Sequence, residues 1–188
     1  MAIALVTVLV VGSIAQAIQG GRLINSSNVS HMLSGMGVLG FVAIGQTLVV
    51  LCKSLDLSVG YSLAATTLVA AIVMDGRSSR VALGVLAAVG VAAAIGLANG
   101  LIITKLRVNS FIATLGVGII IKGYLDTRYQ GPAGAVPRSF QRVGLNKLWV
   151  VPWQTLIMLG LAALVFVLLS RTRLGHSMYA VGGNEEVA

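Results

Sequence analysis

The sequence predicts an all-α, polytopic membrane protein, built as a bundle of about six transmembrane helices. Hydrophobic residues make up 57% of the chain and charged residues 10%, and the mean hydropathy is +0.96. Soluble domains carry roughly 25% charged residues, so this chain lacks the polar side chains that would cover a surface facing water. Lipid is the solvent that fits this composition.

A helix that crosses a bilayer needs about 20 mostly apolar residues. Six segments approach this length, and we expect each to be a membrane helix: residues 2–18, 31–51, 58–74, 81–104, 111–125 and 154–170. The first has no basic region before it and no small-residue cleavage site after it, so it is expected to be a retained helix. Residues 126–152 contain three prolines and are expected to lie outside the bilayer, with short interfacial pieces near Trp149 and Trp153.

Charge indicates membrane topology here and argues against nucleic acid as a partner. The chain carries 13 Lys and Arg against 5 Asp and Glu, a net charge of +8. These basic residues stand singly or in pairs between apolar runs, as anchors at anionic lipid headgroups do, and form no basic stripe with interleaved aromatics. Six crossings would place five cations on one side and seven on the other. The positive-inside rule therefore leaves the orientation open.

The residue types that carry catalysis or metal binding are sparse. Cys52 is the single cysteine, which excludes an intrachain disulfide and a cysteine metal cluster. His31 and His176 lack the spacing of metal ligands, and the sequence contains no GxxxxGK[ST] motif for ATP. Residues 60–64 fail the GxSxG pattern at their last position. We therefore expect no metal, no cofactor and no enzymatic activity.

Glycine is abundant inside the apolar runs, with 23 residues in the chain. Gly96 and Gly100 form a GxxxG step in the fourth run. Such small residues predict close packing of helix backbones in lipid. The alternative is that smooth helices slide past one another during transport.

Polar side chains within or beside the apolar runs are the candidates for function. Gln46 places an amide inside the second run, where an unpaired polar group is costly, so it must face protein or water. Asp56 and Ser58 begin the third run, where Asp56 is either a helix cap or a polar element beside a translocation path. Asn99 is an amide in the fourth run, typical of a hydrogen bond to a neighbouring helix. Lys122 is four residues before Asp126 and is expected to pair with it.

Three stretches, taken in order, resemble the permeases of ribose-type ABC importers. That family typically shows GQTLVILTGGIDLSVG, GLINGLLVAKLRVPPFIATLG and RTRFGRYVYAIGGNPEAA. This chain has GQTLVVLCKSLDLSVG at 45–60, GLANGLIITKLRVNSFIATLG at 96–116 and RTRLGHSMYAVGGNEEVA at 171–188. The DLSVG turn resembles the monosaccharide branch of the superfamily more than the branched-chain amino acid branch.

The resemblance implies a permease subunit that moves a monosaccharide across the bacterial cytoplasmic (inner) membrane by alternating access. Its partners would be two cytoplasmic ATPase subunits, a second permease subunit that is identical or different, and a periplasmic sugar-binding protein. Under this reading Gln46, Asp56, Ser58 and Asn99 are candidates for the substrate pathway or gate. The residues that match the start of the ATPase-coupling segment are Gly182, Gly183, Asn184, Glu185 and Glu186.

Two departures from the family pattern affect the expectation. Lys53 and Ser54 replace the usual glycine pair before the DLSVG turn, so the gate is expected to be altered or impaired. Residues 1–188 are expected to form one transmembrane permease domain that is incomplete at its C-terminus, because the chain stops inside the coupling segment at about 171–188. A fragment, one piece of a split permease and a degenerate remnant all fit this ending.

Two rival functions are compatible with the composition. One is a self-contained membrane subunit that binds a small molecule, like the substrate-binding components of vitamin importers. The other is a structural or assembly subunit with no ligand. The sequence does not specify which sugar a permease of this kind would carry.

Overall fold

The computed structural model describes residues 2–18, 20 and 24–183, and the statements below concern these residues. Its elements in chain order are α1 (Ala2–Ile18), α2 (Ser26–Leu51), α3 (Val59–Met74), the short 3-10 helix η1 (Ser78–Arg80), α4 (Val81–Lys105), α5 (Ser110–Arg128), α6 (Arg138–Leu145), β1 (Lys147–Leu148), β2 (Val151–Pro152), α7 (Trp153–Arg171) and α8 (Arg173–Gly183).

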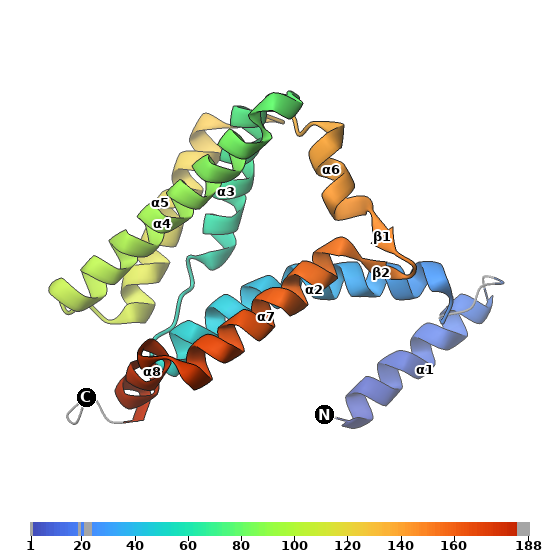
Figure 1. The fold of residues 1–188 in the computed structure, drawn as a ribbon, viewed down its shortest axis with the longest axis horizontal. Helices are drawn as coiled ribbons and strands as arrows, with labels where there is room; N and C mark the ends of the chain where they lie inside the picture. The colour runs from blue at the N-terminus through green and yellow to red at the C-terminus, as the bar shows by residue number, and fades with distance from the viewer. Residues whose placement is uncertain (1, 19, 21–23, 184–188) are drawn as a thin grey trace.

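The helices form two groups (Figure 1). Helices α3, α4 and α5 pack against one another, and α2 lies along α7. Helix α8 turns back at the end of α7 and contacts α2, while α6 and the β1–β2 hairpin connect α5 to α7. Helix α1 lies apart from both groups in Figure 1. The expected all-α bundle is confirmed, with the small hairpin as an addition.

All six predicted apolar runs are helical in the structure. Among the described residues, four helices are long and apolar enough to cross a membrane: α2, α4 (with η1), α5 and α7. Helices α1 and α3 are apolar but shorter, at 17 and 16 residues. The second helix begins at Ser26 and not at residue 31, because Asn25 caps it by accepting a hydrogen bond from the Asn28 N–H. The polar cluster there forms the first helical turn.

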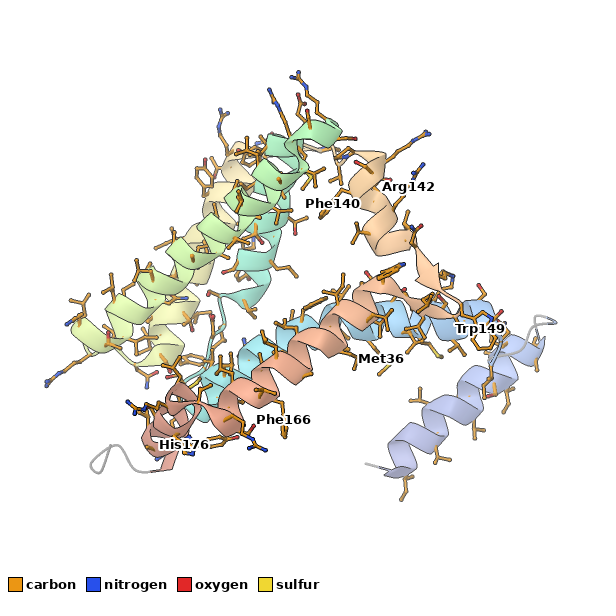
Figure 2. The ribbon with its side chains drawn as sticks, in the orientation of Figure 1. Met36, Phe140, Arg142, Trp149, Phe166 and His176 are labelled. Carbon is orange, nitrogen blue, oxygen red and sulfur yellow. The ribbon has the colours of Figure 1, made fainter. Side chains whose placement is uncertain are left out.

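The segment between α5 and α7 contains structure that the sequence analysis did not locate. Helix α6 follows Pro137, and β1 pairs with β2 in antiparallel register, Lys147 opposite Pro152. Trp149 lies at the hairpin tip with φ of 63° and is 97% exposed (Figure 2). Arg173 to Gly183, part of the third stretch that resembles the permease family, form α8.

The outer helix surfaces are apolar, as membrane lipid requires. Met36 on α2 and Phe166 on α7 are exposed and point away from the paired helices (Figure 2). Among the described residues, the buried apolar side chains are few: Ala65, Met74, Ala113 and Pro152. The interior is therefore held together by close backbone approaches and polar contacts more than by a large apolar core.

Glycines provide several of these approaches. A Cβ placed on Gly40 would lie 2.8 Å from the Met158 side chain, and one on Gly118 would lie 2.9 Å from the Tyr61 ring. The packing interpretation is thus confirmed at these positions. At Gly96 and Gly100 nothing in the described structure lies within 4 Å of a Cβ built there, so close packing at these two positions stays a prediction.

Candidate functional site

The segment 52–58 between α2 and α3 is not helical, so its backbone groups need partners other than those of a helix. Backbone of this kind is tolerated at membrane depth only where protein or water satisfies it. The Gln46 side chain provides one such partner, since its Nε2 donates to the Asp56 carbonyl oxygen at 2.7 Å. The amide predicted to face protein or water therefore fixes the loop that follows its own helix.

The beginning of α5 holds the other side of the same loop. Ser110 Oγ accepts from the Leu55 N–H at 3.2 Å, and Thr114 Oγ1 accepts from the Leu57 N–H at 3.1 Å. Thr114 Oγ1 also lies within hydrogen-bond distance of the Leu55 carbonyl, at 3.2 Å. Two hydroxyls, one turn apart on α5, thus take the place of the missing helical hydrogen bonds.

A buried polar cluster, Asp56–Ser58–Asn99, joins this loop to α4. Asp56 Oδ1 accepts from the Ser58 backbone N–H at 2.8 Å and from Ser58 Oγ at 2.6 Å. Asn99 Nδ2 donates to Ser58 Oγ at 2.9 Å. Ser58 is fully buried and Asn99 is 5% exposed. The start of α3 is therefore held in place by a carboxylate from the loop and an amide from α4.

Proton counting fixes the orientation of the Asn99 amide. The Ser58 hydroxyl has one proton and donates it to the Asp56 carboxylate, so it can only accept from Asn99. Asn99 must then present its NH₂ group to Ser58 and its oxygen to the other side. That oxygen, Oδ1, is buried and has no hydrogen-bond partner in the described structure. A buried acceptor without a partner is costly, and the residue that carries it, Asn99, lines a cavity.

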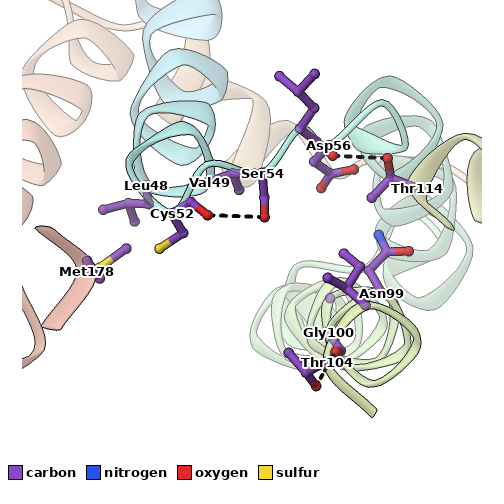
Figure 3. Close-up of a pocket in the computed structure, with 13 residues that line it drawn as sticks. Leu48, Val49, Cys52, Ser54, Asp56, Asn99, Gly100, Thr104, Thr114 and Met178 are labelled. Atoms are coloured by element: carbon purple, nitrogen blue, oxygen red, sulfur yellow. Dashed lines mark hydrogen bonds between the residues drawn. The ribbon is translucent and has the colours of Figure 1, made fainter. Parts of the chain in front are cut away.

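The cavity has a volume of about 380 Å³ and lies between the end of α2, α4, the start of α5 and α8. Figure 3 shows Leu48, Cys52 and Met178 on one side of it and Asn99 and Thr104 on another. Its walls are mainly apolar, with Asp56, Asn99 and a few hydroxyls as polar groups. An apolar cavity with few, fixed polar groups is typical of small-molecule sites.

The structure brings together the four predicted pathway residues, Gln46, Asp56, Ser58 and Asn99, although they span 54 positions of sequence. Asp56 Oδ1 accepts from the N–H of Ser58, the residue just before α3, and the same carboxylate belongs to the cluster beside the cavity. Both interpretations of Asp56 thus fit its position. Sequence reasoning missed Thr114 and Ser110. The available signal was their place at the start of α5, where a hydroxyl can reach a neighbouring loop.

The predicted coupling residues are described only in part. Gly182 and Gly183 end α8, whereas Asn184, Glu185 and Glu186 lie outside the described residues. Gly182 lies against the end of α2, and a Cβ on it would overlap the Leu51 carbonyl oxygen. The end of α8 is therefore docked on α2 through a position that only glycine fits.

Lys53 stands in the left-handed region of the backbone, with φ of 52°. This conformation costs a residue with a Cβ free energy that glycine does not lose, which accounts for glycine in the family pattern at this position. Its ammonium lies 3.4 Å from the Gly183 carbonyl at the end of α8. Lys53, which stands where the family has glycine and was predicted to affect the gate, thus places a cation between the α2–α3 loop and α8.

Replacing Lys53 with glycine is expected to raise the free energy of unfolding by about 0.5–1 kcal/mol. The gain comes from the relieved left-handed strain of about 1–2 kcal/mol, less the chain entropy that glycine loses on folding. Thermal unfolding of the purified chain in detergent would measure it. Ser54→Gly is the matched control, because Ser54 has an ordinary negative φ and should gain nothing.

Comparison with known proteins identifies the family. The family model described as "Branched-chain amino acid transport system / permease component" matches residues 28–188. The chain belongs to this permease family. Together with the four long apolar helices among the described residues, this makes it a multi-pass protein of the cytoplasmic membrane.

Several members of this permease family are similar to the chain. The ribose import permease protein RbsC of Bacillus subtilis (strain 168) is 36% identical over 165 residues, which are 86% of this chain and 51% of RbsC. The galactose/methyl galactoside import permease protein MglC of Escherichia coli (strain K12) is 30% identical over 184 residues, 86% of this chain and 54% of MglC. The L-arabinose transport system permease protein AraH of Escherichia coli (strain K12) is 33% identical over 162 residues, 86% of this chain and 49% of AraH.

The chain spans about half the length of these curated relatives. No solved structure matches it. The resemblance to sugar importer permeases that its three motifs predicted is confirmed at the level of the family.

Proposed function

We propose that the chain acts as a membrane-spanning permease subunit of an ATP-binding-cassette importer that moves a monosaccharide of the ribose type. One observation carries the proposal: the chain belongs to the permease family, and its relatives are named as permeases for ribose, galactose and arabinose. The same observation supports a permease over a self-contained binding subunit.

In this proposal Gln46, Asp56, Ser58 and Asn99 form a gate beside the sugar pathway. Asn99 lines the cavity, and its buried Oδ1 would accept from a sugar hydroxyl once the Asn99 side chain turns toward the sugar. The apolar walls suit the C–H faces of a sugar ring. Asn99 is hydrogen-bonded to Ser58, and Ser58 to Asp56. A sugar bound in the cavity would therefore change the position of the α2–α3 loop through these hydrogen bonds.

The proposed partners follow from the importer assembly. Two cytoplasmic ATPase subunits would hydrolyse ATP and press on the coupling segment, which begins with residues 182–186. A second permease subunit, identical or different, would complete the pathway, and a periplasmic binding protein would deliver the sugar. Residues 1–188 would act as a single transmembrane domain within that assembly.

The test is to express the chain with the ATPase and sugar-binding subunits of a ribose importer whose own permease is deleted. Uptake of radiolabelled ribose, galactose and arabinose is measured in cells, and binding of the ATPase subunit is measured by co-purification. We expect the ATPase subunit to co-purify and the uptake of at least one of the sugars to exceed that of the deletion strain.

Two results would count against the proposal. If the chain neither retains the ATPase subunit nor supports uptake, it is not a permease subunit of such an importer. If the purified chain binds a sugar tightly without any binding protein, the self-contained binding subunit becomes the better account.

A further inference from the structure

A second cleft lies where the loop after α2 meets the α4–α5 turn. It differs from the cavity beside the gate in that cations line it. Its volume is about 770 Å³. Two cations, Lys53 and Arg107, line it together with the polar side chains of Ser54, Thr104, Asn109 and Ser110. None of the described residues that line it is an aspartate or glutamate. The described part of the cleft therefore presents positive charge and hydrogen-bond groups.

Among the described residues, neither cation forms an ion pair. The ion pairs found among the described residues are Arg77 with Asp75 and Lys122 with Asp126, and neither involves the cleft. The Lys53 ammonium makes one hydrogen bond, to the Gly183 carbonyl at 3.4 Å, which leaves two of its protons for other acceptors. The Arg107 guanidinium presents a planar fork of donors, the geometry that matches phosphate oxygens.

The start of α5 adds neutral donors to the same cleft. Ser110 Oγ accepts from the Leu55 N–H, so its own proton remains available. The Asn109 side-chain oxygen accepts from the Phe111 N–H, which leaves its NH₂ group as a donor. These groups stand at the N-terminal end of a 19-residue helix, whose dipole also favours an anion.

Several residues next to the lining in sequence are apolar and exposed. Leu106 is 70% exposed, Leu55 is 51% exposed and Phe111 is 46% exposed. All three belong to the ends of helices that are long enough to span a bilayer or to the loops between them. A ligand in the cleft therefore meets the two cations, and exposed apolar side chains flank the lining residues along the chain.

We propose that this cleft binds the phosphate headgroup of an anionic membrane phospholipid. A phospholipid matches both halves of the site, because its phosphate oxygens accept from Lys53, Arg107 and the α5 donors while its acyl chains cover the apolar rim. A soluble phosphate would use the polar half alone. This site goes beyond the proposed transport function and does not depend on which sugar is carried.

The experiment titrates the purified full chain, in neutral detergent, with phosphatidylglycerol and with phosphatidylcholine, and reads binding by native mass spectrometry. Phosphatidylglycerol is expected to bind more tightly. Lys53→Gly and Arg107→Gly should each weaken it about fivefold, since a basic residue near an anionic lipid surface contributes about 1 kcal/mol. Both positions have positive φ, 52° and 54°, so glycine preserves the backbone and the fold. Lys105→Gln is the matched control, a neighbouring exposed cation outside the lining.

Four results would overturn the assignment. Equal affinity for the two lipids, or an equal loss in Lys105→Gln, would mean that the cleft has no specific role. If inorganic phosphate binds as tightly as phosphatidylglycerol, and its binding is lost in the same variants, the cleft would be assigned to a soluble phosphate. A dependence of ATPase-subunit binding on Lys53 and Arg107, with no lipid effect, would assign it to the carboxylates of a protein partner.

Discussion

Replacing Asp56 with alanine is expected to lower the free energy of unfolding by about 2–4 kcal/mol, since each buried donor left unsatisfied costs about 1–3 kcal/mol. The carboxylate accepts both the backbone N–H and the hydroxyl of Ser58, and Ser58 is fully buried. Removing it leaves both donors of Ser58 without an acceptor. Equilibrium unfolding of the purified chain in mixed micelles, followed by circular dichroism, would measure the loss.

Two further variants separate hydrogen bonding from charge. Asp56→Asn keeps an oxygen that can accept both Ser58 donors, so its loss of stability should be well below that of Asp56→Ala. Asp126→Ala removes a carboxylate from an exposed pair on α5 and should change stability little. If Asp56→Ala and Asp126→Ala behave alike, the Asp56–Ser58–Asn99 cluster does not hold the loop.

The same pair of variants bears on the proposed gate. Should Asp56→Asn fold normally yet fail to support sugar uptake, the negative charge would have a role beyond capping α3. If it supports normal uptake, the contribution of Asp56 would be structural, through Ser58. Stability and uptake measured on one variant thus discriminate the two interpretations that the sequence left open for this residue.

The membrane helices could be predicted from sequence because the hydrocarbon core of a bilayer allows the backbone few conformations. A long apolar run must satisfy its backbone internally, and the α-helix does so within one segment. The run at 81–104 accordingly matches α4 (Val81–Lys105) to within one residue at its end. The start of α2 was harder to locate, since Asn25 and the serines after it suit both a loop and a helix cap.

The shorter elements could not be predicted on the same grounds. Helix α6 has 8 residues, three of them Arg or Gly, and its hydrophobicity is too low to mark it as a membrane helix. The available signal was Pro137 before it, with Phe140 and Val143 one turn apart. Helix α8 contains three glycines and begins with Arg173, a cation at the end of a helix where anions are favoured. Tertiary contacts with α7 and α2 hold it in place.

The candidate site was predictable in its residue types but not in its geometry. A polar side chain in an apolar run needs a partner, which selected Gln46 and Asn99. The partners themselves depend on the folding of segment 52–58, and Asn99 meets Ser58 across 41 positions of sequence. Pattern alone also could not reveal that Asn99 Oδ1 is left without a partner, because that follows from the direction of the Ser58 proton.

Replacing Gly182 with alanine is expected to undock the end of α8 from α2. A Cβ at this position overlaps the Leu51 carbonyl oxygen, which is backbone and cannot rotate away as a side chain could. Overpacking of this kind costs about 1–3 kcal/mol, enough to shift a docking equilibrium by roughly 5–150-fold. If the α8 end transmits force from the ATPase subunits, as proposed, sugar uptake should fall by a similar factor.

Gly183→Ala is the matched control, because nothing in the described structure lies within 4 Å of a Cβ built on Gly183. The two variants change neighbouring residues of the same motif by one methyl group, so differences in helix propensity largely cancel.

Docking is read from the distance between spin labels on Cys52, the single native cysteine, and on a cysteine introduced by Ser177→Cys. Gly182→Ala should lengthen and broaden that distance while Gly183→Ala leaves it unchanged. An unchanged distance in Gly182→Ala would mean that α8 is not held by this contact. A lengthened distance with normal uptake would mean that force reaches the gate by another route.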